Sequence, residues 1–174
     1  MNVTTSLVTQ LKITEVPNLD PIDVMLENYE PGKGRITIRC YTRVWTSYWG
    51  AMSGRTVQDF FAGCDNGYLI SNLAPGLSHE ISDGEIINEH IRKKVIQMRK
   101  EGDLDASEAR EIYDDCYCID GPGDLQHWEH TKVMFGDEWW YADLPTRPNP
   151  EYVYLCRIID AVREGLVLTA KKAA

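Results

Sequence analysis

The sequence lacks any apolar run long enough to span a bilayer, which takes about 20 consecutive apolar residues. It also does not open with the basic, apolar and small-residue series that marks a secretion signal. These absences argue against a membrane or exported protein. We therefore expect a cytoplasmic protein that makes no contact with a membrane.

The signatures of several large enzyme classes are also missing. The chain has no phosphate-binding loop, no Gly-x-Gly-x-x-Gly motif, no Gly-x-Ser-x-Gly elbow and no His-Glu-x-x-His pair. It contains no internal repeat and no low-complexity tract. A binding protein is therefore expected ahead of an enzyme, with no catalytic residue and no cofactor assigned.

Cysteine is present, but in a pattern that argues against a disulfide framework. The five cysteines are odd in number and widely scattered, as in proteins of a reducing compartment. They lie at positions 40, 64, 116, 118 and 156. Most are expected to act as small buried apolar residues.

Length and composition indicate a globular protein. The chain has 174 residues, 43% of them hydrophobic and 26% charged, which is enough for one domain with a substantial core. We expect a flexible N-terminus over residues 1–10, a single domain over 11–168 and a frayed tail over 169–174. The proline- and glycine-containing turns fall between periodic segments inside this domain.

The clearest predicted element is Arg35–Trp49, which has no glycine or proline and is rich in β-branched and aromatic residues. It predicts one long strand that pairs, through a turn at Pro31–Gly34, with a strand starting at Ile22. Aligning the apolar residues places Asp23 opposite Arg43. The predicted fold is α+β: an antiparallel sheet built on this long N-terminal hairpin, with three to four packed helices.

Capping residues and helical periodicity predict the remaining elements. These are a helix capped by Thr56 that breaks near 65–67, a helix capped by Ser82, a helix from Ala106 to about Cys118 capped by Asp105, a second hairpin at 131–142, and a last helix from Pro150 to Glu164.

One face of the predicted long strand is rich in arginines and aromatic residues. Its members are Arg35, Arg39, Tyr41, Arg43, Trp45 and Trp49. Such a face suits the stacking of single-stranded nucleic acid, but cross-strand carboxylates or a covering helix explain it equally well. A net charge of −9 disfavours direct nucleic-acid binding, because neutralising phosphates supplies most of that affinity. Direct binding therefore remains an alternative.

Acidic residues are concentrated in the middle of the chain. Residues 56–124 hold fifteen acidic and six basic side chains, and 101–124 hold nine acidic residues against Arg110 alone. A field of this sign attracts basic partners, including the nucleic-acid-binding surfaces of other proteins. A solvated helix face that maintains solubility is the other explanation. The candidate contact residues are Asp103, Asp105, Glu108, Glu111, Asp114 and Asp115.

A metal site is a further hypothesis. Four soft or borderline ligands fall within fifteen residues: Cys116, Cys118, His127 and His130. Their spacing differs from that of common zinc fingers. A neighbouring acidic group could instead hold magnesium or calcium, although it lacks the spacing of a calcium loop: Asp114, Asp115, Asp120 and Asp124. Either set would favour a metal-dependent enzyme.

Three segments of the first half, Gly34–Tyr41, Trp45–Met52 and Thr56–Leu69, resemble a family of small accessory proteins encoded by tailed bacteriophages and prophages of enteric bacteria. The resemblance covers about residues 34–73. It implies an early phage gene product that acts on host defence, recombination or transcription by binding. Together with the acidic segment, it predicts an inhibitor or decoy that occupies the basic surface of a host restriction, CRISPR or nuclease complex.

Overall fold

A computed structural model describes residues 1–173, which divide into two compact units. Unit 1 comprises Met1–Ser78 together with the chain from Pro150 onward, and unit 2 comprises His79–Asn149. The sequence of unit 2 is therefore inserted into that of unit 1. The expectation that 11–168 behave as one domain stays a prediction.

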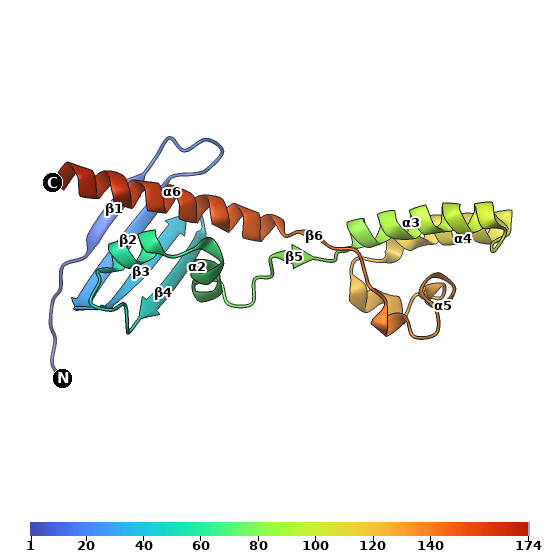
Figure 1. The fold of residues 1–174 in the computed structure, drawn as a ribbon, viewed down its shortest axis with the longest axis horizontal. Helices are drawn as coiled ribbons and strands as arrows, with labels where there is room; N and C mark the ends of the chain where they lie inside the picture. The colour runs from blue at the N-terminus through green and yellow to red at the C-terminus, as the bar shows by residue number, and fades with distance from the viewer. Residues whose placement is uncertain (174) are drawn as a thin grey trace. The chain divides into compact units, whose positions relative to one another are not determined.

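Unit 1 is built on a four-stranded antiparallel sheet (Figure 1). Its strands are β1 (Thr9–Ile13), β2 (Ile22–Glu30), β3 (Lys33–Cys40) and β4 (Arg43–Trp49), in the order β1-β2-β3-β4. The β2–β3 hairpin turns at Pro31 and Gly32, and the φ of +80° at Gly32 is one that glycine adopts without steric cost. The predicted α+β class is confirmed.

The predicted single strand over 35–49 was wrong. Tyr41 and Thr42 form a two-residue turn, in which Tyr41 takes a φ of +54°, and the chain reverses between β3 and β4. The predicted register was wrong for the same reason. Asp23 lies opposite Arg39 rather than Arg43. Since neither Tyr nor Thr is a typical turn residue, the pattern of side chains gave no sign of this turn.

Three helices pack on one face of the sheet: α1 (Val57–Gly63), α2 (Asn66–Leu73) and α6 (Pro150–Ala173). The cap at Thr56 and the break after α1 are confirmed, because Asp65 begins α2 by accepting from the Tyr68 N–H. The last helix continues well past Glu164. The predicted tail, 169–174, is helical as far as Ala173, and its final residue lies outside the described residues.

The core of unit 1 joins this sheet face to the three helices. Ile22, Val24, Ile36 and Ile38 all point to the covered face and are fully buried. They pack in one cluster with apolar side chains from each helix, including Phe61, Leu69, Ile70, Leu155, Ile158 and Val162. The other sheet face carries mainly charged and polar residues, together with the exposed Val44 and Tyr48. This alternation follows from the two-residue period of a strand.

Unit 2 has a separate core built mainly from helices. Its elements are β5 (Glu80–Ile81), α3 (Gly84–Glu101), α4 (Ala106–Asp115), α5 (Thr131–Phe135) and β6 (Arg147–Pro148), with 3₁₀ turns at Cys116–Cys118, Pro122–Gln126 and Trp139–Tyr141. The short strands β5 and β6 pair where the chain enters and leaves the unit. Within the described chain, no helix is long and apolar enough to cross a membrane.

Three predictions for unit 2 need correction. The second hairpin at 131–142 was wrong, because α5 and a 3₁₀ turn at Trp139–Tyr141 occupy that segment. Asp83, not Ser82, caps α3 by accepting from the Ile86 N–H. The cap at Asp105 is confirmed, but α4 ends at Asp115 and continues only as a 3₁₀ turn.

Candidate functional site

The two units differ sharply in charge. Unit 2 contains 17 acidic and eight basic side chains, for −9, whereas unit 1 contains ten of each, for zero. The whole formal charge of the protein therefore belongs to unit 2. Sequence reasoning located most of this excess within 101–124, and the structure adds that the remaining residues of the unit do not offset it.

Helix α4 carries most of the predicted contact residues. The hydrogen bonds of its first turn explain why a helix begins at this point of the chain. The Asp105 side chain accepts from the backbone N–H groups of Ser107 and Glu108, and the Glu108 carboxylate accepts from the Asp105 N–H. This capping box satisfies donors that the helix leaves unpaired. The hydrogen bonds from the Glu108 and Ser107 N–H groups lower the pKa of Asp105. Both carboxylates therefore have a structural role.

Three other predicted acidic residues are available to a partner. Asp103, Glu111 and Asp114 are exposed, and none forms an ion pair with lysine or arginine among the described residues. Asp115 is less free, because its Oδ2 accepts a 2.7 Å hydrogen bond from the Trp128 Nε1–H. The site thus combines free carboxylates with carboxylates that hold the local structure.

Four of the five basic residues of α3 form contacts inside unit 2: Arg92, Lys93, Lys94 and Arg99. The Arg92 guanidinium lies 3.5 Å from the centre of the Tyr117 ring and 5.1 Å from that of Tyr113. Lys94 donates to the Met134 carbonyl and lies over the Phe135 ring. Such cation–π contacts hold these cations against apolar surface. Arg92 and Lys94 therefore stabilise packing within the unit.

The four predicted Cys and His ligands do not converge. Cys116 is buried and its Sγ donates to the Tyr113 carbonyl, and burial raises the pKa of its thiol. Cys118 is exposed and lines a shallow pocket of about 370 Å³ with His127. His130 instead groups with carboxylates. In the acidic group considered for magnesium or calcium, Asp124 already accepts hydrogen bonds from two backbone N–H groups of its own turn.

His130 lies in a cluster with two glutamates, and one of these, Glu129, was not among the predicted site residues. Ligand atoms of Glu111, Glu129 and His130 all lie within 4.8 Å of one another. Glu111 comes from α4, whereas Glu129 and His130 precede α5. Sequence reasoning used Glu111 and His130 in two different hypotheses and passed over Glu129. No spacing rule links these positions, since the chain folds back between them.

The predicted arginine and aromatic face is split between the two sides of the sheet. The turn at Tyr41 shifts the alternation, so Trp49 is buried in the core and Trp45 packs against it. Arg35 and Arg39 remain on the opposite, uncovered face. The structure therefore does not bring the indoles and these arginines together as one stacking platform.

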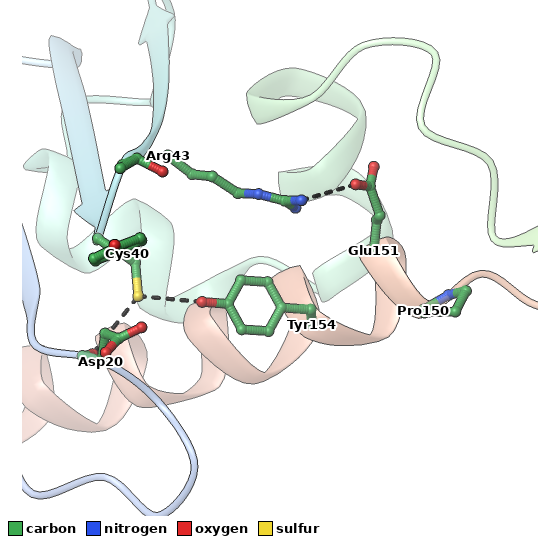
Figure 2. A pocket seen from close by; sticks show the side chains of 8 residues that line it. Asp20, Cys40, Arg43, Pro150, Glu151 and Tyr154 are labelled. Carbon is green, nitrogen blue, oxygen red and sulfur yellow. Dashed lines mark hydrogen bonds and ion pairs between the residues drawn. The ribbon is translucent and has the colours of Figure 1, made fainter.

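Arg43 reaches the covered side of the sheet, where it contributes to a shallow pocket of about 350 Å³ (Figure 2). Its guanidinium forms a 2.9 Å ion pair with Glu151 and lies over the Tyr154 ring. The Tyr154 hydroxyl is 3.4 Å from the Cys40 Sγ, and this hydrogen bond, with burial, raises the pKa of Tyr154. Figure 2 shows these contacts joining the end of β3 and the start of β4 to α6, which fits a structural role.

Comparison with known proteins supplies an origin. No curated protein and no solved structure matches the chain. A family model described as a phage family, Phage_phiTE_072, matches residues 1–167, which is almost the whole length. The resemblance to phage proteins is thereby confirmed, while the enteric hosts and the accessory role stay predictions. The chain belongs to this family of phage proteins.

Proposed function

We propose that this phage protein binds a host protein that handles nucleic acid, such as a restriction, CRISPR or nuclease complex, and inhibits or redirects it. The acidic surface of unit 2 occupies the basic surface on which the host protein would hold nucleic acid. The observation that carries the proposal is the charge division, −9 in unit 2 against zero in unit 1.

The free carboxylates provide the contact. Asp103, Glu111 and Asp114 are exposed on or beside α4 without a basic partner among the described residues. Pairing them with lysines or arginines of a partner breaks no contact with a basic side chain inside this protein. Asp105 and Glu108 contribute negative potential from their fixed positions in the capping box.

Electrostatics of this kind acts mainly on the rate of association. A surface of one sign raises association rates by about 10–10³-fold, and added salt screens the effect, with a Debye length of about 8 Å at physiological ionic strength. Binding is therefore expected to be fast at low salt and much weaker at high salt. Nucleic acid and this protein compete for the same basic surface.

The test is capture from enteric bacterial lysate, with and without added nuclease, read by mass spectrometry at low and high salt. Three proteins are compared: the wild type, a variant reversed on unit 2 and a control reversed on unit 1. The first variant carries Asp103→Lys, Glu111→Lys and Asp114→Lys. The control carries Glu15→Lys, Asp20→Lys and Glu164→Lys, which change the total charge equally at three exposed positions.

The expected result is a host protein that the wild type and the control retain at low salt and that the unit 2 variant loses. Circular dichroism must show that both variants keep the wild-type helix content. Equal retention by all three proteins would contradict the proposal, as would loss of the captured protein when nuclease is added.

A further inference from the structure

We propose that Glu111, Glu129 and His130 form a binding site for a divalent transition metal ion, with Zn²⁺ as its best match. The inference does not rest on the proposed binding of a host protein, although the two proposals share Glu111. It rests on the convergence of three ligand atoms, on a buried ring nitrogen without a partner, and on a local excess of carboxylates.

The distances suit coordination better than hydrogen bonding. His130 Nε2 lies 3.6 Å from Glu129 Oε1 and 3.9 Å from an oxygen of Asp115, both too long for a hydrogen bond. Ligands around a tetrahedral zinc ion lie about 3.4 Å apart, which follows from metal–ligand bonds of about 2.1 Å. Since the three proposed ligand atoms lie within 4.8 Å of one another, small side-chain rotations bring them to this separation.

The ring nitrogen of His130 needs a partner. Nε2 is buried and has no hydrogen bond, and the whole side chain is only 14% exposed. A buried polar atom without a partner is unfavourable, so such an atom in a folded protein points to a group that satisfies it. A metal ion bound between Nε2 and the two glutamates supplies that partner.

The surrounding charge also favours a cation. Glu111, Asp115 and Glu129 lie around one imidazole, and in the part of the chain described here none of them pairs with lysine or arginine. Carboxylates this close repel one another and stabilise a bound cation. A set of imidazole and carboxylate ligands is typical of zinc and manganese, whereas magnesium prefers oxygen and water alone.

A second layer of contacts holds the ligands in place. The Trp128 ring packs edge-on against His130, 5.4 Å between ring centres, and its Nε1–H donates to Asp115. Such outer contacts fix the orientation of metal ligands. Glu129 also lines the pocket of about 370 Å³, which gives a water molecule access to a fourth position. The ion thereby joins α4 to the segment before α5.

Isothermal titration with ZnCl₂ and with MgCl₂, on metal-stripped full-length protein, tests the site. We expect one Zn²⁺ per chain and at least tenfold weaker binding of Mg²⁺. Glu111→Gln and His130→Asn should each weaken Zn²⁺ binding at least tenfold. Glu111 is exposed, so its substitution keeps the test decisive even if the change at His130 impairs folding.

Two matched controls separate a site from general attraction. Asp114→Asn removes the same charge from the same helix, and His127→Asn removes an exposed histidine three positions from His130. Both controls should bind Zn²⁺ as the wild type does. Absence of stoichiometric Zn²⁺ binding would overturn the proposal. Equal weakening by Glu111→Gln and Asp114→Asn, or equal affinities for Zn²⁺ and Mg²⁺, would also overturn it.

Discussion

The two units of this protein use charge in different ways. In unit 1, opposite charges are equal in number and several are paired across elements, as Asp23 is with Arg39 and Glu151 with Arg43. Unit 2 also forms ion pairs across elements, as Asp83 does with Arg147, but its acidic residues outnumber the basic ones about two to one, so many carboxylates have no basic partner available within the unit. Charge in unit 1 thus serves the fold, whereas the surplus in unit 2 remains available for binding.

Their cores differ as well. Unit 1 packs one sheet face against three helices, whereas unit 2 relies on short helices and 3₁₀ turns around Ile87, Ile91 and Trp128. A sheet and its covering helices bury a continuous apolar layer, which supports a stable scaffold. This difference agrees with the proposal, in which unit 1 is the scaffold and unit 2 carries the binding surface.

Truncating one buried side chain in each core tests this comparison, and it has the largest expected effect on stability. Phe61→Ala should destabilise unit 1 by about 3–5 kcal/mol and Ile91→Ala should destabilise unit 2 by about 2–5 kcal/mol, because both side chains are fully buried. Hydrogen exchange read by mass spectrometry should show faster exchange mainly in the unit that carries the change. Equal acceleration in both units would mean that the division has no energetic basis.

The next largest effect on stability is expected at two glycines, one in each unit, where another segment of the chain passes close to the glycine. A Cβ at Gly34 would clash with Val57 and with the Glu27 carbonyl, and one at Gly84 would clash with the Ile119 carbonyl and lie 2.8 Å from Asp120 Cα. Gly34→Ala and Gly84→Ala should each cost about 1–3 kcal/mol in urea unfolding. Gly123→Ala, where a Cβ meets no atom within 4 Å, is the control. If Gly123→Ala lost as much stability as the other two variants, a steric clash of the added Cβ could not be the cause.

Asp83 holds the start of α3 through contacts that depend on its carboxylate being ionised. Burial alone would raise the pKa of Asp83, but the hydrogen bonds from Arg147 and from the Ile86 N–H outweigh it and lower the pKa below its usual 3.8. The contribution of Asp83 to stability is therefore complete above pH 3.8 and is lost as the pH falls through the lowered value. Asp83→Ala should cost about 1–2 kcal/mol at pH 7, from the lost helix cap and ion pair.

The matched variant is Asp83→Asn, which keeps a capping oxygen but cannot titrate. Thermal melts between pH 6 and pH 2.5 should show less loss of stability on acidification for this variant than for the wild type. Identical pH profiles would rule out Asp83 as a source of the acid sensitivity.

The smallest effect is expected at an exposed ion pair of unit 1. Lys33 and Glu30 are 2.8 Å apart at the tip of the β2–β3 hairpin, and both side chains are largely exposed. Water and salt screen such pairs, so Lys33→Ala should leave the melting temperature unchanged within error. A clear decrease would show that paired charges on the surface of unit 1 contribute more than the account allows.

Local signals predicted much of the fold. Thr56 and Asp105 were recognised as helix caps because their side chains bond nearby backbone N–H groups, which sequence spacing alone reveals. The turn at Tyr41 was missed because it contains no typical turn residue. Because side chains in a strand alternate with a period of two, this turn places Trp45 and Trp49 on the opposite face of the sheet from Arg35 and Arg39.

The site was harder to predict than the fold. The predicted acidic contact residues are close in sequence and most lie on one helix, so their grouping could be recognised from composition. The cluster of Glu111, Glu129 and His130 forms only because the chain folds back between α4 and α5. The segment around Trp139 and Trp140 was read as a strand from its aromatic residues, but it forms a 3₁₀ turn. Tertiary contacts of this kind have no local signature.

The most direct test of the central claim is a competition measurement on the captured host protein. Fluorescence anisotropy of a labelled oligonucleotide bound to that protein is followed while the wild type, the unit 2 reversal or the unit 1 reversal is added. The account predicts that the wild type and the unit 1 reversal release the oligonucleotide at low salt and that the unit 2 reversal does not. Equal release by both reversed variants, or no release by the wild type, would contradict it.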